Sequence, residues 1–593
     1  MKNILKNKTF WIVLGITLVG AFLRLYHFDD WMHYQLDQAR DYRIVHAAAE
    51  YGPGELPLQG PRAAGSFLRL GPLLYYLEYL SILVFGDTPA GSVLVIAILN
   101  ILAIPLFYFF VRNIFEQKLS LGLTAMFSVS LFMVIYSRFG WNPNLVVFFM
   151  LLLFYALTRV SSDESNYNHL WLIIASVALV FLMNMHFITF VLAPVVVFVY
   201  LIWTRPHIPK RWWFASLIVI IFLNTPLIVN DIKTGGENFR EFVAVALDHT
   251  AKDDEKSTHS LKNKLMRNVA LEGQYFWIVL TGNQEVRTDF LYKDIDVKKC
   301  DNVCRKGMIM GIVSLVVLSL SNILFGWKYY TRKNTKEVDT LKLLLLWSAG
   351  VFVIYIPLAF DTAPRFFLLL TPIFIVLLGV IFQFLLRYLK LPGLYLSALL
   401  IFILVVFNLF YDFEYFGQLS QSRENPDFRL PHKDYILKEK TRITFAQMMD
   451  IVDWIEEKYE QNKYPVFLHS QAEYKRALWE RIDIRDIPRS YIPGDLNKLY
   501  REANYFIIIR SQSNQESFLK KYTDKMYIID KKSFGTLTGY YLRPKPEFIT
   551  AEKKTFDNKS RDPKFSQGVQ PRYLWRQVFE GCTYNHKTDK CEK

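Results

Sequence analysis

Several features that would indicate a soluble or nucleic-acid-binding protein are scarce or missing in this sequence. The 593 residues include four cysteines, no glycine-rich phosphate loop, no arginine-rich arm, no internal repeat and no low-complexity tract. Charged residues fall mostly between long apolar runs and in the last third of the chain. The net charge of +15 therefore indicates membrane topology and attraction to a lipid surface, and no nucleic acid is expected as a partner.

The few cysteines form two close pairs along the chain, Cys300 with Cys304 and Cys582 with Cys591. Pairs this close are typical of local disulfides in a compartment outside the cytoplasm. The alternative is a four-cysteine zinc site, which would require both pairs to meet in space.

Twelve apolar runs are present, most of them of the length that spans a bilayer core, and they predict a polytopic α-helical membrane protein. They lie near residues 10–28, 70–86, 89–112, 119–137, 143–160, 169–185, 187–204, 212–230, 307–327, 342–360, 366–387 and 392–411. The first follows three lysines as in a signal peptide, but it is long and no small-residue cleavage site follows it. We therefore expect an uncleaved first helix.

Basic loops determine which runs cross the membrane. The N-terminus, residues 205–211, residues 328–342 and the pair Arg387 and Lys390 are rich in lysine or arginine and predict cytoplasmic segments. Loops must alternate between the cytoplasmic and the outer side along the chain. The basic loops agree with this alternation if run 70–86, which contains Glu78 and many tyrosines, does not cross the membrane but lies along its outer surface. The prediction is about eleven transmembrane helices plus interfacial helices in residues 1–411, a cytoplasmic N-terminus, and outer loops at 28–69 and 231–306.

Residues 412–593 differ in character, with charges throughout and no further apolar span. A helical period covers 444–459, and short apolar segments at 465–469, 505–509 and 526–530 resemble buried strands. We expect a small extracytoplasmic α/β domain there, on a multi-pass protein of the plasma membrane.

Four polar clusters fall on the predicted outer side. The first contains Asp37 and Asp41, which share a face of a helix, with Arg40 and Arg43 beside them. The others are residues 137–144 with Arg138 and Asn142, residues 184–186 with His186, and residues 361–367 with Arg365.

Each cluster has a purely structural alternative. The aspartates would pair with Arg40 and Arg43, and Arg138 would anchor the chain at the membrane interface. His186 would be a satisfied polar residue between helices, and Arg365 would pair with Asp361. Ionisable groups at helix ends around one aqueous cavity favour function instead.

These segments, in this order, resemble the GT-C superfamily of integral-membrane glycosyltransferases. The motifs are FLRLY at the first helix end, LDQARD with its two aspartates, GPLLYY from Gly71, SRFGWNP, and RFFLLLTP from Arg365. Within the superfamily they are most similar to the protein O-mannosyltransferase and aminoarabinose-transferase branch. The resemblance covers residues 10–411 and implies transfer of a sugar, with inversion, from a polyprenyl phosphate to an acceptor protein, lipid or glycan on the outer face.

The resemblance also implies roles for residues. A carboxylate of the first outer loop acts as the acid/base, a role that falls on Asp37 with Asp41 second. A carboxylate can accept the proton of an attacking hydroxyl, and arginine binds phosphate oxygens through two parallel hydrogen bonds. The arginines expected to bind the donor phosphate are Arg365, Arg138, Arg69 and Arg62, with His186 and Asn142 as further ligands of sugar or phosphate.

Other interpretations remain open at this stage. A transporter or flippase of a lipid-linked or polar substrate also has a polar cavity among many spans, but it favours repeated halves and broken midplane helices. A noncatalytic scaffold and a hydrolase of lipid-linked sugars are further alternatives. No cofactor is required, and a divalent metal held by Asp37 and Asp41 is the minor alternative because no third protein ligand is evident.

Overall fold

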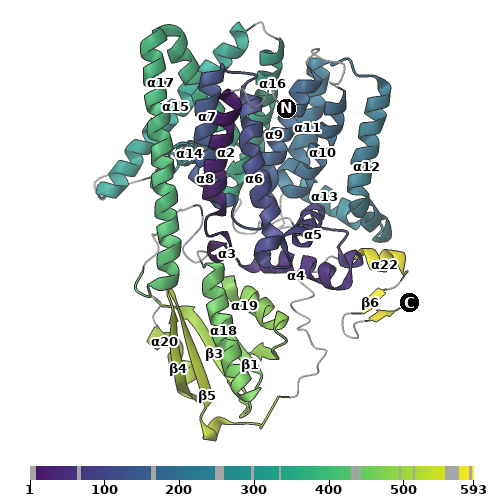
Figure 1. The fold of residues 1–593 in the computed structure, drawn as a ribbon, viewed down its shortest axis with the longest axis vertical. Coiled ribbons are helices and arrows are strands. Elements are labelled where there is room, and N and C mark those ends of the chain that lie inside the picture. The colour runs from purple at the N-terminus through teal and green to yellow at the C-terminus, as the bar shows by residue number, and fades with distance from the viewer. Residues whose placement is uncertain are drawn as a thin grey trace.

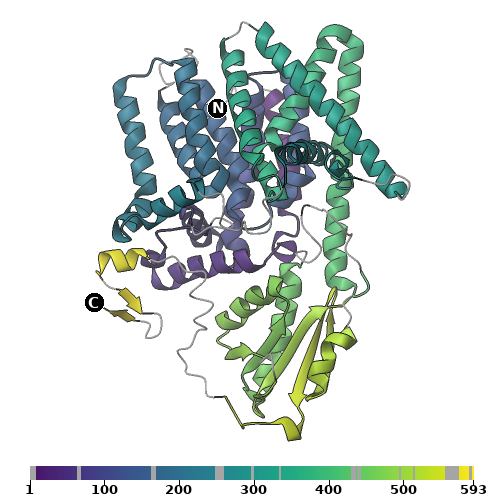
Figure 2. The same ribbon diagram turned by 180° about the vertical axis from the view of Figure 1, so that it is seen from behind.

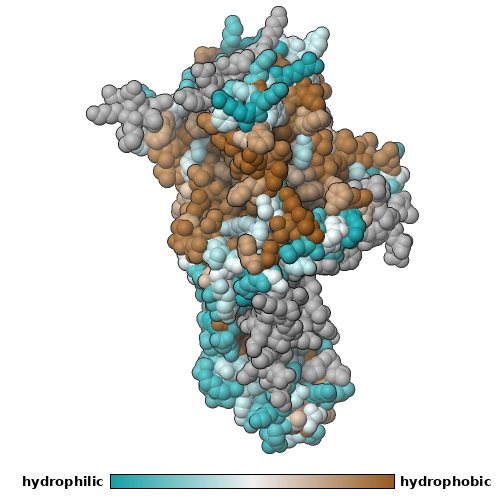
Figure 3. Space-filling view, turned by 90° about the vertical axis from the view of Figure 1, so that its right-hand side faces the viewer, coloured by the Kyte–Doolittle hydropathy of each residue, from teal (hydrophilic) through white to brown (hydrophobic). Residues whose placement is uncertain are grey.

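The computed structural model describes residues 8–62, 68–161, 169–247, 259–294, 300–332, 335–428, 436, 443–492, 496–511, 515–554, 573–581, 583–585 and 590–592. A helical bundle forms one end of the molecule and a small sheet domain the other (Figures 1 and 2). On the face that Figure 3 shows, the middle of the bundle is mostly hydrophobic, whereas the coloured part of the sheet domain is mostly hydrophilic. The prediction of a polytopic helical membrane protein with a C-terminal α/β domain is confirmed.

Eight helices among the described residues are long and apolar enough to cross a membrane. They are α2 (Lys8–Leu25), α6 (Pro89–Val111), η2 with α9 (Asn142–Leu145 and Val146–Val160), α11 (Phe187–Thr204), α12 (Lys210–Lys233), α15 (Asn302–Thr331), α16 (Thr335–Tyr355) and α17 (Thr371–Glu424).

The predicted eleven crossings and these eight helices describe the same apolar segments. Helix α10 (Leu170–Met185) is too short to be counted, and run 119–137 is divided into α7 (Gln117–Val129) and α8 (Leu131–Tyr136). Helix α17 contains two predicted runs, separated where Lys390 leaves helical geometry with φ +49°. Pro392 lies two residues further on and favours a break here, because its ring has no backbone donor and clashes with the carbonyl four residues earlier in a continuous helix.

The break between α7 and α8 is stabilised from elsewhere in the bundle. The amide of Leu131 donates to Asn408 Oδ1 of α17 at 3.0 Å, and the Ser130 hydroxyl donates to the carbonyl of Val279 at 2.9 Å. Buried polar backbone groups at a helix end need such partners. The interruption therefore depends on long-range contacts, and a single apolar run in the sequence gives no sign of it.

Short helices cover the end of the bundle that faces the sheet domain. Loop 28–69 forms α3 (Phe28–Trp31), α4 (Leu36–Tyr51) and η1 (Pro53–Glu55), and it is followed by α5 (Leu73–Phe85). At thirteen residues α5 is too short to span a bilayer, in agreement with the predicted surface helix. The predicted loop 231–306 is largely helical: it contains α13 (Glu237–Leu247), α14 (Leu261–Thr281), η3 (Asp289–Leu291) and the start of α15. The short helix η5 (Pro364–Leu369) joins α16 to α17.

Helix α17 continues to Glu424, past the predicted domain boundary at residue 412. The five-stranded sheet of the C-terminal domain has the order β2-β1-β3-β5-β4, with β1 parallel to β2 and β3 and β5 antiparallel to β3 and β4. The strands are β1 (Val466–Ser470), β2 (Arg489–Tyr491), β3 (Asn504–Arg510), β4 (Met526–Phe534) and β5 (Leu537–Pro544). The helices are α18 (Phe445–Asn462), α19 (Ala472–Ile484), α20 (Gln515–Thr523) and η7 (Pro546–Phe548). The predicted helix and three strands are present, whereas β2 and β5 were not predicted.

This domain packs directly on the first outer loop. The Tyr34 hydroxyl donates to Glu480 Oε2 of α19 at 2.7 Å, and the amide of Phe445 donates to the carbonyl of Met32 at 3.0 Å. In the ribbon views α4 lies across the end of the bundle, toward the sheet domain (Figures 1 and 2). The position of α4 is therefore fixed from both sides.

A second C-terminal contact reaches the same loop. Residues 573–579, which we call the C-terminal strap and which include α22 (Trp575–Phe579), run alongside residues 56–58. The Leu58 amide donates to the Tyr573 carbonyl at 3.0 Å, and Trp575 Nε1 donates to the Tyr76 hydroxyl at 2.8 Å. Arg576 pairs with Glu55 at 2.8 Å. The hairpin of β6 (Thr583–Asn585) and β7 (Lys590–Glu592) follows the strap.

The predicted local disulfide between Cys300 and Cys304 is present at the start of α15. Cys582 lies outside the described residues, and the side chain of Cys591 is not described. The second predicted pair therefore stays a prediction.

Candidate active site

The acidic stretch of the first outer loop forms α4. Its first turn is closed by a reciprocal cap between Gln35 and Gln38. Asp37 and Asp41 lie one turn apart on one face, with Arg40 between them: Arg40 Nη1 donates to Asp37 Oδ1 at 2.9 Å and Arg40 Nε donates to Asp41 Oδ1 at 2.6 Å. Arg43 instead faces Asp483 of the C-terminal domain at 3.7 Å.

Burial distinguishes the two aspartates. The side chain of Asp37 is 36% exposed and that of Asp41 is 1% exposed. Burial raises the pKa of Asp41, and the neighbouring Arg40 guanidinium opposes that rise. Asp37 is therefore accessible from outside, whereas Asp41 is enclosed and pairs with Arg40.

Arg365 lies in η5, and its guanidinium stacks on Trp141 at 4.7 Å and on Phe366 at 5.3 Å. Within the described residues it makes no hydrogen bond or ion pair, and the alternative pair with Asp361 is not formed. Burial lowers the pKa of Arg365, and the charges of Tyr136 and Asp37 oppose that lowering. Stacking fixes the plane of the guanidinium while its N–H donors stay available for a ligand.

His186 and Asn142 lie around Arg365. The His186 ring meets the Phe366 ring edge-on at 5.0 Å, and its Nδ1 accepts from the Ile188 amide at 3.1 Å. Burial and the charge of Arg365 lower the pKa of His186 to about 3, so the ring is neutral and Nε2 carries the proton. Asn142 begins η2, which packs against η5, and both polar atoms of its buried amide have no hydrogen-bond partner in the described part of the chain.

Arg138, predicted as a phosphate ligand, has a different environment. Its guanidinium donates to four carbonyls at the end of α2: Leu23 and Arg24 from Nη1 at 3.0 and 3.1 Å, and Tyr26 and His27 from Nη2 at 2.6 and 3.4 Å. These carbonyls are the unpaired acceptors of a helix C-terminus, and a cation there also complements the helix dipole. Arg138 therefore caps α2 and joins it to the loop that carries Trp141.

This cap predicts a stability effect. Arg138→Gln is expected to lower the free energy of unfolding by about 3 kcal/mol, because several buried carbonyls lose their donor. Thermal unfolding in detergent measures the change, with the surface variant Arg501→Gln as control. Unchanged unfolding combined with lost donor binding would restore Arg138 as a phosphate ligand.

Arg62 and Arg69 face each other across a short hairpin closed by hydrogen bonds between Gly60 and Leu70 at 2.8 Å and between Leu70 and Pro61 at 3.0 Å. The Arg69 amide donates to Asn238 Oδ1 at 2.9 Å, next to α13. The hairpin then packs on α10, because a Cβ at Gly71 would lie 1.5 Å from Asn184 Oδ1. Both arginines thus lie on a hairpin at the end of the first outer loop, next to α13.

Two buried residues beside the aspartates were not predicted as part of the site. Glu78 of α5 is 1% exposed, its Oε2 has no hydrogen-bond partner among the described residues, and the charge of Asp41 acts on it. Tyr75 lies one turn earlier, with its hydroxyl beside Asp41. Burial raises the pKa of Glu78, and Asp41 raises it further. A carboxylate inside an apolar run was the available sequence signal, but it was interpreted only as a mark of a surface helix.

The Glu78 and Asp41 pair predicts a pH dependence of stability. Because both pKa values are raised on folding, the native state takes up protons, and stability falls as pH rises above about 4.5, the ordinary pKa of Glu. Glu78→Gln removes part of this loss, on the order of 1 kcal/mol per pH unit. The unfolding midpoint of Glu78→Gln minus that of wild type should therefore increase from pH 5 to pH 8. Glu50→Gln, on the exposed end of α4, serves as control, and an unchanged difference across pH would contradict the prediction.

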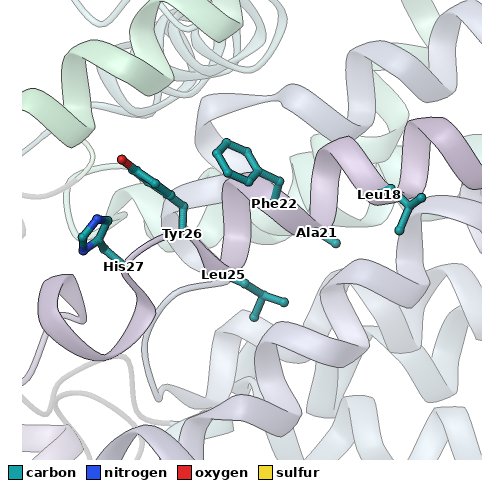
Figure 4. Close-up of a pocket in the computed structure, with 6 residues that line it drawn as sticks. All are labelled: Leu18, Ala21, Phe22, Leu25, Tyr26 and His27. Atoms are coloured by element: carbon teal, nitrogen blue, oxygen red, sulfur yellow. The ribbon is translucent and has the colours of Figure 1, made fainter.

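A surface pocket of about 560 Å³ lies along α2, lined by Leu18, Ala21, Phe22, Leu25, Tyr26 and His27 (Figure 4). Leu18 and Phe22 are at least half exposed, so this hollow faces lipid and contains none of the predicted site residues. Among the described residues, no group of three or more His, Cys, Asp or Glu side chains is arranged to hold a metal ion.

Residues 70–229 match the family model of dolichyl-phosphate-mannose-protein mannosyltransferase. ArnT from Cupriavidus metallidurans bound to undecaprenyl phosphate is 13% identical, with a TM-score of 0.41 over 90% of this chain and 98% of ArnT. The apo oligosaccharyltransferase of Archaeoglobus fulgidus is 10% identical, with a TM-score of 0.46 over 85% of this chain and 69% of that one.

The same archaeal enzyme, AglB, in complex with an inhibitory peptide and a dolichol-phosphate, is 11% identical, with a TM-score of 0.44 over 92% of this chain and 75% of that one. No curated protein matches the chain significantly. The matched segment 70–229 begins at the GPLLYY motif and includes SRFGWNP and His186. The expected resemblance to the protein O-mannosyltransferases is confirmed over residues 70–229.

Proposed function

We propose that this protein is an inverting glycosyltransferase that moves a sugar from a polyprenyl-phosphate donor to an acceptor hydroxyl on the outer face of the membrane. One observation carries the proposal: the guanidinium of Arg365 is stacked on Trp141, makes no hydrogen bond or ion pair within the described residues, and interacts electrostatically with Asp37, an accessible carboxylate. The reaction requires a base for the acceptor hydroxyl and an anion-binding group for the leaving phosphate.

In the proposed reaction the acceptor oxygen attacks the anomeric carbon as the bond from that carbon to the phosphate oxygen breaks. The acceptor proton passes to the Asp37 carboxylate, and the electron pair of the broken bond stays on the lipid phosphate. General-base assistance of this kind contributes roughly 10²–10⁴-fold. Asp41 does not accept the proton in this scheme; it orients Arg40, which in turn orients Asp37.

Arg365 binds the phosphate and stabilises the charge that it gains as the sugar leaves. The neutral His186 donates from Nε2 to a phosphate or sugar oxygen, and the unpaired amide of Asn142 binds a sugar hydroxyl. A buried amide without a partner is unfavourable by about 1–3 kcal/mol, so a ligand that pairs with it binds more tightly. The reaction requires no cofactor.

The matched family is described as transferring mannose from dolichyl phosphate to protein, and this supports a lipid-linked donor. For the present chain the acceptor is a protein, lipid or glycan of the cell envelope. We place the N-terminus in the cytoplasm and the C-terminal domain outside, because the basic segments lie at the end of the bundle away from that domain.

The test is an assay of the purified protein in nanodiscs against a panel of radiolabelled polyprenyl-phosphate sugars, with and without EDTA. Donor consumption with label appearing in an acceptor supports the transferase, and label released only as free sugar indicates a hydrolase. If no donor is consumed while lipid-linked sugar crosses the bilayer of proteoliposomes, the protein is a flippase and the proposal fails.

A further inference from the structure

Two basic segments, far apart in sequence, meet at the end of the bundle away from the sheet domain. They are the last turn of α15 and the stretch of α17 before its break at Lys390, where the helix turns back (Figures 1 and 2). Between them lies a pocket lined by Lys328, Arg332 and Arg387, together with Gln383, Trp327 and Phe384. None of these residues takes part in the proposed reaction.

The cations of this pocket are held to different degrees. Lys328 is 3% exposed and is fixed by the carbonyl of Ile114 at 3.1 Å, by Gln383 and by Glu337 at 2.9 Å. Arg332 shares Glu337 at 3.5 Å. Arg387 is exposed and has no hydrogen bond or ion pair in the described part of the chain; its guanidinium lies 5.6 Å from the Trp327 ring. Three cations against one carboxylate leave an excess of two positive charges.

The surroundings of the pocket are lipid-facing. Trp327, which lines the pocket, is exposed, as is Tyr388 next to Arg387. Exposed apolar side chains of α15, among them Ile323, Leu320 and Val316, continue from Trp327 along the helix. Aromatic residues beside basic ones are typical of the level of the lipid headgroups. The interior measures about 20 Å³, room for about one water-sized group, so a phosphate would lie at the mouth with one oxygen directed inward.

We propose that this pocket, formed by Lys328, Arg332 and Arg387 beside Trp327, binds the phosphate headgroup of an anionic phospholipid whose acyl chains lie along α15. The excess charge selects an anion, and the apolar strip below the pocket favours a lipid over free phosphate. Basic pockets between transmembrane helices bind anionic headgroups in this way. The site is separate from Asp37 and Arg365 and does not depend on the proposed transferase activity.

Native mass spectrometry of the purified protein, titrated with phosphatidylglycerol or phosphatidylcholine, tests this site. Wild type is expected to bind phosphatidylglycerol preferentially. Arg332→Gln/Arg387→Gln should weaken that binding about 25-fold, since each basic residue near an anionic surface contributes about fivefold. The control is Arg211→Gln, because Arg211 is also exposed and stacked on a tryptophan, Trp212 at 5.7 Å, at a helix end.

Retention of phosphatidylglycerol by Arg211→Gln together with its loss from the double variant, at unchanged thermal unfolding, supports the site. The proposal is wrong if wild type binds both lipids equally, or if Arg211→Gln loses phosphatidylglycerol to the same extent, which would indicate only general surface charge. Inorganic phosphate competing at the affinity of the lipid would also overturn it, because the acyl chains would then contribute nothing.

Discussion

Asp37→Asn should reduce glycosyl transfer by about 10²–10⁴-fold, the contribution expected of a positioned general base. Asparagine preserves the size of the side chain and still meets Arg40 through its amide oxygen, so α4 and its packing should be retained. The measurement is turnover in nanodiscs with saturating donor, together with donor binding by the same preparation. We expect binding to change little, because the lost interaction concerns the acceptor proton.

The control is Asp361→Asn. Asp361 is exposed, lies in the segment leading into η5 and makes no ion pair with Arg365, so its variant should retain wild-type turnover. If Asp37→Asn turned over donor at the wild-type rate, the role of base would pass to another group. If both variants lost activity equally, the loss would reflect the general charge of this surface.

The second large effect is expected at Arg365. Arg365→Gln should lower kcat/KM by roughly 10²–10³-fold, the scale seen when one donor to a developing anion is removed. Arg365→Lys keeps the charge but not the planar fork, so it should recover only part of the loss. Both kcat and donor affinity should fall, because the phosphate is present in the bound donor and gains charge at the transition state.

Arg267→Gln provides the matched control. The Arg267 guanidinium also stacks on an aromatic ring, Phe360 at 4.4 Å, but Nε already donates to the Ala359 carbonyl at 2.7 Å. Its loss should leave kcat/KM within about threefold of wild type, as expected for a residue outside the reaction. If Arg267→Gln lowered kcat/KM more than Arg365→Gln, we would assign phosphate binding to Arg267 of α14 instead.

The sequence predicted those parts of this molecule that depend on local pattern. Apolar length located the spans, the basic pair Arg387 and Lys390 separated the two runs that α17 contains, and the four-residue spacing placed Asp37 and Asp41 on one helical face. Strand β5 was not predicted, because its segment LTGYYLRP has a glycine and no regular alternation, and its burial comes from pairing with β3 and β4.

What the sequence did not predict depends on contacts between distant segments. Arg138 follows a helix and faces the outer side, as a phosphate ligand would, but its partners are carbonyls more than a hundred residues earlier in the chain. The difference between Asp37 and Asp41 likewise comes from burial by α5 and its Glu78. Residue type and spacing do not contain that information, since both aspartates have the same local pattern.

The C-terminal strap links the folding of the first outer loop to the time course of synthesis. Glu55 leaves the ribosome early, whereas its partner Arg576 is made about 520 residues later (576 − 55 = 521). At about 5–20 residues per second this delay is roughly half a minute to two minutes. The segment around Glu55 is thus made without its final contacts and acquires them only after Arg576 has been translated.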